Sequence, residues 1–321
     1  MSKVEQAIPG TTVTKNSWFR RFSVIPKIVA KGVLWVNPDT DPNDITRRSL
    51  AKAWEASEEA ARLNADGKVH FRESLPIVEE FGESMFLDWL DGPVAERKNQ
   101  IAPGSHDTKK GGALDASCDK LCRLVGGVSR MVTAYRRGDW YGVLMAGAAT
   151  IAAPASAYYR SAGEERGEKF GENGDGFKNE EGLGHRKWFK KVDILGFLGT
   201  QLGGNFLTNS ATTWGNLGTR IGRIGIYYQD AADTLSFVSA VKTGWVRSKG
   251  GQPIELPITS DSEEYEKAVK QLEKIKDDAS YRKGWLGCVW AGTALVVAAT
   301  GVWISLQEKN KKDSQVFKKA A

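Results

Sequence analysis

The hydrophobic residues of this 321-residue chain are concentrated in a few long stretches. Three stretches without a charged residue are long enough to cross a hydrocarbon layer, which takes roughly 20 helical residues. They cover residues 140–159, 194–219 and 284–306. The last has Trp285 and Trp303 near its ends, where aromatic residues are enriched at membrane interfaces. The pattern predicts an all-α, multi-pass transmembrane helix bundle. Buried helices of a soluble α-protein are the alternative.

More polar helices are predicted in the first half of the chain. Residues 17–36 have the pattern of an amphipathic helix at the membrane surface, and the turn-rich sequence 37–43 ends it. Helical periodicity follows at 45–64, 76–90 and 111–135, and the Gly- and Pro-containing residues 93–110 predict a loop between the last two helices.

In the second half, the strongly polar residues 160–191 predict a solvated loop. A weaker apolar segment at 224–241 carries Asp230 and Asp233, and a charged helix is predicted at 262–278, before the last span. The sequence pattern therefore predicts seven helices in total. We expect about six of them to cross the membrane, so that one of 45–64 or 224–241 does not span.

Charge and composition narrow the function classes. The net charge is +6, and the basic runs lie beside the apolar stretches, which favours anionic lipid head groups over nucleic acid. Three cysteines and three histidines give neither a disulfide framework nor zinc spacing. We therefore expect a cell-membrane protein surrounded by membrane lipids. The terminal residues 318–321, Lys-Lys-Ala-Ala, would act as an endoplasmic-reticulum retrieval signal in a eukaryote.

Four aspartates carry the candidate chemistry. Asp88 and Asp91 are three residues apart, and Asp115 and Asp119 are four apart, so each pair shares one face of its helix. Two such helices can place four carboxylates around one point, where their repulsion requires a cation. Oxygen ligands and phosphate chemistry point to Mg²⁺ or Mn²⁺. The alternative is that the four residues are solvated charges at helix ends.

The same residues resemble a known signature. Asp88-x-x-Asp91-Gly92-x-x-Ala95, followed by Gly111-x-x-x-Asp115-x-x-x-Asp119, is similar to the motif D-x-x-D-G-x-x-A-R…G-x-x-x-D-x-x-x-D of the CDP-alcohol phosphatidyltransferases, which are integral membrane enzymes. An upstream Pro-Asn-x-x-Thr sequence at 42–46 looks like the stretch that opens the first transmembrane helix of that family. Three departures stand out: Glu96 takes the place of the arginine, with Arg97 one position later; the connection to Gly111 is longer; and the helix after Thr46 is more polar than a first transmembrane helix.

The resemblance implies a role for each matching position. Asp88, Asp91 and Asp115 would ligate the metals, and Asp119 would be a further ligand and the catalytic base. The expected substrate-binding residues are Gly92, Ala95, Arg97, Gly111, Pro42, Asn43 and Thr46.

The implied reaction moves a phosphatidyl group from CDP-diacylglycerol to a small alcohol or phospho-alcohol, such as glycerol 3-phosphate or inositol phosphate, and releases CMP. We expect no nucleic-acid partner, and a homodimer is an open expectation. A non-catalytic or ion-binding multi-pass membrane protein that uses the same aspartates is the first alternative, with Asp230 and Asp233 on its pathway. A hydrolase that uses water as acceptor is the second.

This interpretation divides the chain into five parts. They are an N-terminal polar segment with the interfacial helix (1–40), the helices that carry the motif (41–160), a polar cytoplasmic loop (161–191), the remaining membrane helices (192–308) and a basic tail (309–321).

Overall fold

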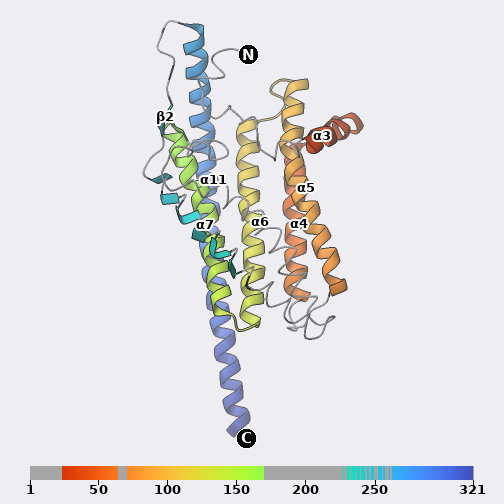
Figure 1. The fold of residues 1–321 in the computed structure, drawn as a ribbon, viewed down its shortest axis with the longest axis vertical. Coiled ribbons are helices and arrows are strands. Elements are labelled where there is room, and N and C mark those ends of the chain that lie inside the picture. Colours follow the sequence, from red (N-terminus) through yellow and green to blue (C-terminus); the bar gives the residue numbers. More distant parts are fainter. Residues whose placement is uncertain are drawn as a thin grey trace.

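The computed structural model describes residues 24–63 and 71–169, together with residues 227–320 apart from short gaps before 262. Within these ranges the chain is helical apart from short connections and two paired two-residue strands, so the predicted all-α class is confirmed. The long helices α4, α5, α6, α7 and α11 run lengthwise beside one another, and the shorter α3 lies across them (Figure 1).

Helix α3 (Val24–Val36) has one buried side and one exposed apolar side. Ala30 and Leu34 are buried in a cluster to which α4 and α5 contribute Ile45, Leu90 and Val94. The exposed apolar residues of α3 are Ile25, Ile28, Trp35 and Val36. The expected amphipathic helix is therefore present over Val24–Val36, whereas residues 17–23 lie outside the described ranges.

Helix α4 (Pro42–Leu63) is polar, and it packs on α5 (Phe71–Ile101) through small residues. Ala56 and Ala60 are buried against Ile77 and Phe81. The hydroxyl groups of Ser49 and Ser84 each donate to the other residue's carbonyl at 2.8 Å. A narrow stripe of Ala and Ser is thus enough to hold α4, which leaves its charged residues on the outside.

The predicted end of the second polar helix near Leu90 was wrong, because α5 continues through Pro93 to Ile101. Proline inside a helix loses one backbone hydrogen bond and its ring crowds the carbonyl four residues earlier, a cost of about 3 kcal/mol that packing has to offset. Here Leu90 and Val94, with 5% and 0% exposure, lie in the cluster with α3. Only residues 102–107 connect α5 to α6 (Thr108–Arg136), so the loop predicted over 93–110 is largely helical.

Helix α7 (Trp140–Glu165) is longer than its predicted apolar stretch, because residues 160–165 of the expected loop continue the helix. Glu164 is buried there. Its carboxylate accepts a hydrogen bond from Arg160 and forms an ion pair with Arg282 of α11. Paired charges therefore replace solvent at this end of α7. Two short strands follow, in which β1 (Glu168–Lys169) pairs antiparallel with β2 (Gln252–Pro253).

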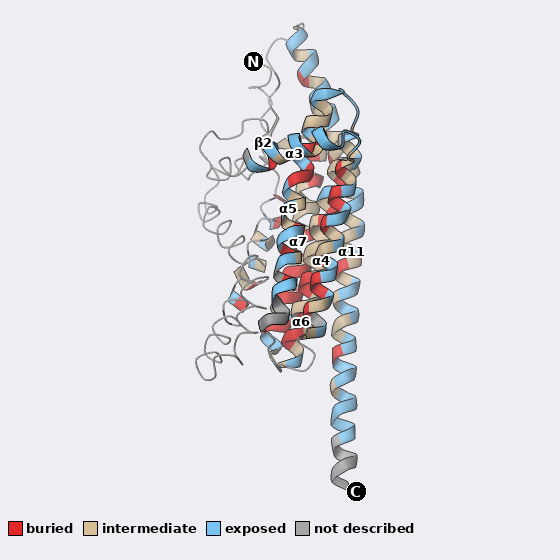
Figure 2. Ribbon diagram, turned by 90° about the vertical axis from the view of Figure 1, so that its right-hand side faces the viewer, coloured by how far each residue is buried: buried red, intermediate tan, exposed pale blue. Residues whose placement is uncertain are grey.

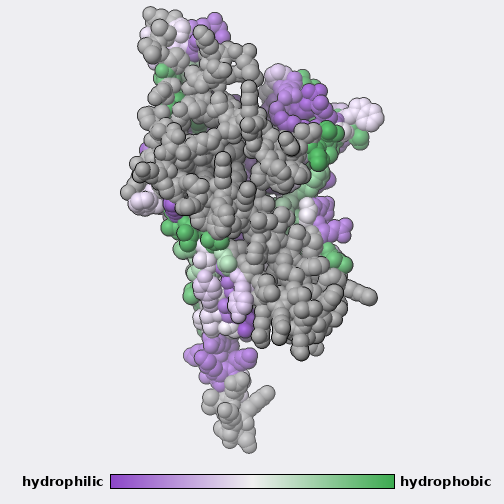
Figure 3. All heavy atoms as spheres, viewed as in Figure 1, coloured by the Kyte–Doolittle hydropathy of each residue, from purple (hydrophilic) through white to green (hydrophobic). Residues whose placement is uncertain are grey.

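Helix α11 (Glu263–Ala320) is one continuous helix of 58 residues. The charged helix, the last apolar span and the basic tail were predicted as separate segments, and the structure joins them. It packs on α6 and α7 as far along as Ile304, and its C-terminal end projects beyond the bundle with exposed residues (Figure 2). Figure 3 shows hydrophobic surface beside the middle of the long helices and hydrophilic surface near the end of α11.

Among the described residues, α11 is the one helix long and apolar enough to cross a membrane, and only 11% of its apolar window is buried within the chain. The predicted span at 194–219 lies outside the described ranges. The described positions between Tyr227 and Ser248 are helical and run parallel to α7, because Thr234 bonds Tyr141 near the start of α7 and Arg247 bonds the Ser156 carbonyl near its end.

Candidate metal centre

Three of the four predicted aspartates come together between α5 and α6. One carboxylate oxygen from each of Asp88, Asp91 and Asp115 lies within 4.8 Å of the others. Asp88 and Asp91 are neighbours on one face of α5, and Asp115 faces them from α6. Asp91 is buried, Asp88 is half-buried and Asp115 is exposed, so the group opens on the side of α6.

Thr46 of α4 forms a hydrogen bond with the most buried carboxylate of this triad. Its hydroxyl donates to Asp91 Oδ2 at 2.6 Å and lies 3.2 Å from the Pro42 carbonyl, one turn earlier. Thr46 and Asp91 are only 3% and 6% exposed. Asn43 stands in the same first turn, and its backbone N–H donates to Asp41 Oδ1. The start of α4 thus orients the most buried carboxylate, whereas no contact in the described ranges joins Asn43 itself to the aspartates.

Asp119 lies one turn beyond Asp115 on α6, near enough to Asp88 and Asp115 for their negative charges to repel. Two cations balance it. Lys120 forms a close ion pair with one oxygen, and Arg123 Nε lies 3.6 Å from the other. Sequence reasoning gave these two residues no role, although a basic residue four positions after Asp119 is the spacing of a helical ion pair.

The three clustered carboxylates fit a hard divalent cation. Two unit charges 4.8 Å apart repel by about 3.5 kcal/mol at an effective dielectric constant of about 20, and three such pairs accumulate here. The hydroxyl of Thr46 offsets only part of this. An all-oxygen donor set suits Mg²⁺ or Mn²⁺, which would keep positions for water or phosphate oxygens on the open side.

The two motif glycines lie in different surroundings. A Cβ placed on Gly92 would meet no atom within 4 Å, so this part of α5 is open to a ligand. A Cβ on Gly111 would lie 2.3 Å from Nε2 of His106, so the histidine ring already occupies that space. Ala95, one turn after Asp91, is half-buried.

The charged residues after Ala95 turn away from the aspartates. Glu96, which stands where the signature has arginine, lies 3.6 Å from Lys27 of α3. Arg97 donates to the side-chain oxygen of Gln100 at 3.1 Å. No described contact joins Arg97 to the triad, so the structure does not bring this predicted substrate-binding residue to the site.

Asp230 and Asp233, the residues of the predicted ion pathway, lie near the opposite end of α6. Asp233 is buried and accepts from Arg130 Nε at 3.2 Å. Asp230 is also buried, and one of its oxygens would lie 3.0 Å from a Cβ on Gly142 of α7. The Asp233 carboxylate is therefore balanced by a fixed cation.

The chain matches no known family model, no curated protein and no solved structure at a significant level.

Proposed function

We propose that the chain is a metal-dependent, membrane-bound transferase that moves the phosphatidyl group of CDP-diacylglycerol to an alcohol and releases CMP. The grouping of Asp88, Asp91 and Asp115 within 4.8 Å, at the spacing of the CDP-alcohol phosphatidyltransferase signature, carries this proposal. Three carboxylates at one point favour a divalent cation, and a cation with open positions favours phosphate as a ligand. The open space at Gly92 leaves room for that ligand.

The reaction requires a base and a stabilised phosphoryl group. Asp88, Asp91 and Asp115 would hold Mg²⁺ or Mn²⁺, which would supply positive charge to the phosphate oxygens. Asp119 accepts the proton of the acceptor hydroxyl, whose oxygen forms a bond to the lipid-linked phosphorus as the bond from that phosphorus to CMP breaks. CMP leaves with the electron pair. Lys120 and Arg123 keep Asp119 ionised, which is the form that a base needs, although the same two cations lower its affinity for a proton.

Membrane attachment is part of the proposal. Helix α11 crosses the bilayer through its apolar residues 284–306, and α7 crosses beside it through residues 140–159, which carry no charge. Ion pairs join α7 and α11 at one boundary, between Glu164 and Arg282 and between Glu165 and Lys283. The exposed charges of α4 make it the helix that does not span, so the segment at 224–241 belongs to the multi-pass set.

The test is CMP release by the purified chain from CDP-diacylglycerol, with Mg²⁺ or Mn²⁺ and a panel of alcohols that includes glycerol 3-phosphate and inositol phosphate. We expect metal-dependent release with at least one alcohol, and loss of release in Asp119→Asn with Mn²⁺ binding retained. Asp44→Asn, an exposed aspartate at the start of α4, is the matched control and should keep full release. Wild-type protein that releases no CMP with any alcohol would end this proposal and favour the ion-binding alternative.

A further inference from the structure

His106 lies directly on the backbone of Gly111. An ideal Cβ on Gly111 would be 2.3 Å from Nε2 and 3.0 Å from Cε1 of the imidazole. Real Cβ atoms do not approach other atoms so closely, so the ring can lie there only because residue 111 is glycine. At Gly92, by contrast, no atom lies within 4 Å of the same position.

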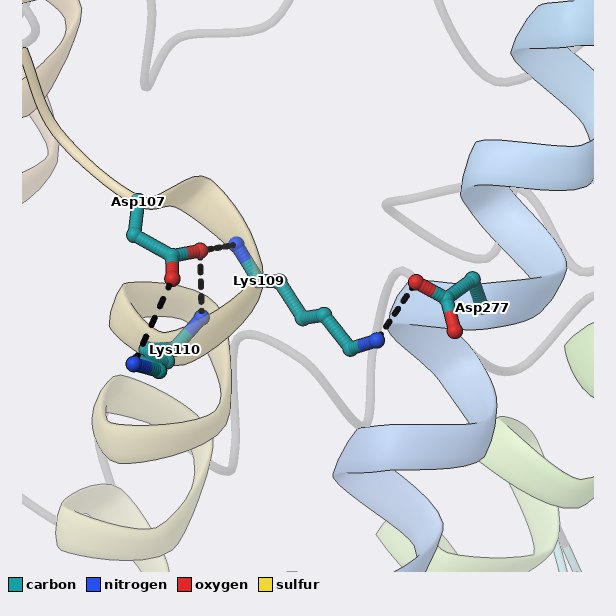
Figure 4. A network of polar contacts seen from close by, with 4 residues as sticks. All are labelled: Asp107, Lys109, Lys110 and Asp277. Carbon is teal, nitrogen blue, oxygen red and sulfur yellow. Dashed lines mark hydrogen bonds and ion pairs between the residues drawn. The ribbon is translucent and has the colours of Figure 1, made fainter. Parts of the chain in front are cut away.

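The connection between α5 and α6 holds His106 in this place. Its backbone amide donates to the side-chain oxygen of Asn99 at 3.1 Å, and Gly104, at φ +81°, provides the left-handed turn before it. Asp107 then caps α6 by accepting from the backbone amides of Lys109 and Lys110 (Figure 4). These amides, that of Lys110 most of all, lower the pKa of Asp107. The histidine backbone is therefore fixed by hydrogen bonds on both sides.

An ion pair also joins this N-terminal end of α6 to α11. Lys109 Nζ lies 2.5 Å from Asp277 Oδ2, and the Lys110 side chain pairs with Asp107 (Figure 4). Lys98, near the end of α5, donates to the Thr40 carbonyl. These lysines around the connection thus have protein partners. No hydrogen bond to another described residue occupies either imidazole nitrogen of His106, so the ring is available to a ligand.

The imidazole ring of His106 lies close enough to the aspartate triad to contact a ligand bound there. Gly111 and Asp115 are four residues apart on one face of α6, so His106 lies one turn from the exposed carboxylate of the triad. A ligand larger than phosphate can extend from the open side along this face of α6. In one direction it meets Asp119 with its two cations, and in the other it meets Gly111 and the imidazole ring of His106.

We infer that His106 forms the wall of the nucleotide pocket at Gly111 and contacts the cytidine part of the CDP-linked lipid, so that Gly111 serves to seat the histidine ring and not to receive the nucleotide directly. This inference rests on the proposed function. An imidazole can stack on a pyrimidine base or donate a hydrogen bond to it, and aromatic stacking on a base contributes about 1–3 kcal/mol, or roughly five- to 150-fold in affinity.

The test is CDP binding measured by calorimetry in the presence of Mn²⁺, with the full chain in detergent. We expect His106→Ala to weaken CDP binding about tenfold and to leave Mn²⁺ binding unchanged. Gly111→Ala should weaken CDP binding to a similar extent, because its methyl group displaces the ring. In the double variant the Gly111→Ala change should have little additional effect. Ser105→Ala, in the same connection, is the control and should bind as the wild type does.

Each contrary result has its own meaning. If Gly111→Ala weakens CDP binding as strongly in the His106→Ala background as alone, the nucleotide contacts Gly111 directly and the inference is wrong. Unchanged or tighter CDP binding by His106→Ala, with an unchanged melting temperature, also overturns it. Wild-type protein that binds neither Mn²⁺ nor CDP would refute the proposed function itself. If the wild type binds both and His106→Ala does not change CDP binding, only the role of His106 is refuted.

Discussion

Replacing Asp115 by Asn should stabilise the metal-free protein and destabilise the metal-bound one. In the triad, Asp115 faces two other carboxylates whose oxygen atoms lie within 4.8 Å. At 4.8 Å each pair repels by about 3.5 kcal/mol at a dielectric constant of about 20, so before further screening two pairs amount to at least about 7 kcal/mol. Because Asp115 is exposed, water screens most of this repulsion. We expect about 1 kcal/mol of net stabilisation when the charge is removed without metal.

The assay is thermal unfolding in detergent, once with EDTA and once with Mn²⁺. With EDTA, the variant should unfold at a higher temperature than the wild type. With Mn²⁺ at about 100 times its dissociation constant, the wild type should gain about 2.7 kcal/mol and the variant clearly less. Asp313→Asn removes an exposed charge near the C-terminal end of α11, away from the triad, and its small effect should be the same in both conditions. The reasoning would be refuted if the variant were less stable than the wild type in EDTA. It would also be refuted if Mn²⁺ stabilised the variant and the wild type equally.

Three further predictions concern single contacts. Thr46→Val should weaken Mn²⁺ binding by roughly tenfold, because Asp91 loses a buried hydrogen bond of about 1.5–3 kcal/mol, whereas Thr46→Ser should bind as the wild type does. Glu164→Gln should lower the free energy of unfolding by roughly 2–3 kcal/mol, measured by denaturant titration, since it leaves Arg282 without its charge partner; an unchanged midpoint would contradict this. Asp107→Ala should lower the melting temperature at pH 7. The native pKa of Asp107 is depressed, so this difference should persist above about pH 4 and vanish as the pH falls through that native pKa; a difference independent of pH would exclude the charged cap.

Spacing along the sequence was enough to predict the helical class and the placement of three aspartates. The i,i+3 and i,i+4 intervals place Asp88 with Asp91 and Asp115 with Asp119 on common helix faces, whatever the exact helix ends are. The apolar stretch 284–306 and the helix 111–135 were equally readable, because their patterns are long and uninterrupted.

The rest depended on contacts between distant residues. Pro93 was read as the end of a helix, but the buried neighbours Leu90 and Val94 keep α5 continuous. The charged segments around 284–306 were read as separate, although no glycine or proline pattern interrupts α11 there strongly enough to end it. His106 had no signal beyond its place between Arg97 and Gly111, where the spacing is longer than in the signature. Its contact with Gly111 follows from the turn at Gly104, which local sequence does not fix.

The central claim is tested most directly by the stoichiometry of products from CDP-diacylglycerol, measured by mass spectrometry in one reaction with Mn²⁺ and an alcohol acceptor. The account predicts equal amounts of CMP and of phosphatidyl-alcohol, and neither product when EDTA is present or when Asp91 is replaced by Asn. CMP accompanied by phosphatidic acid would show that water is the acceptor. No CMP from a folded protein that binds Mn²⁺ would contradict the claim that this site is a transferase.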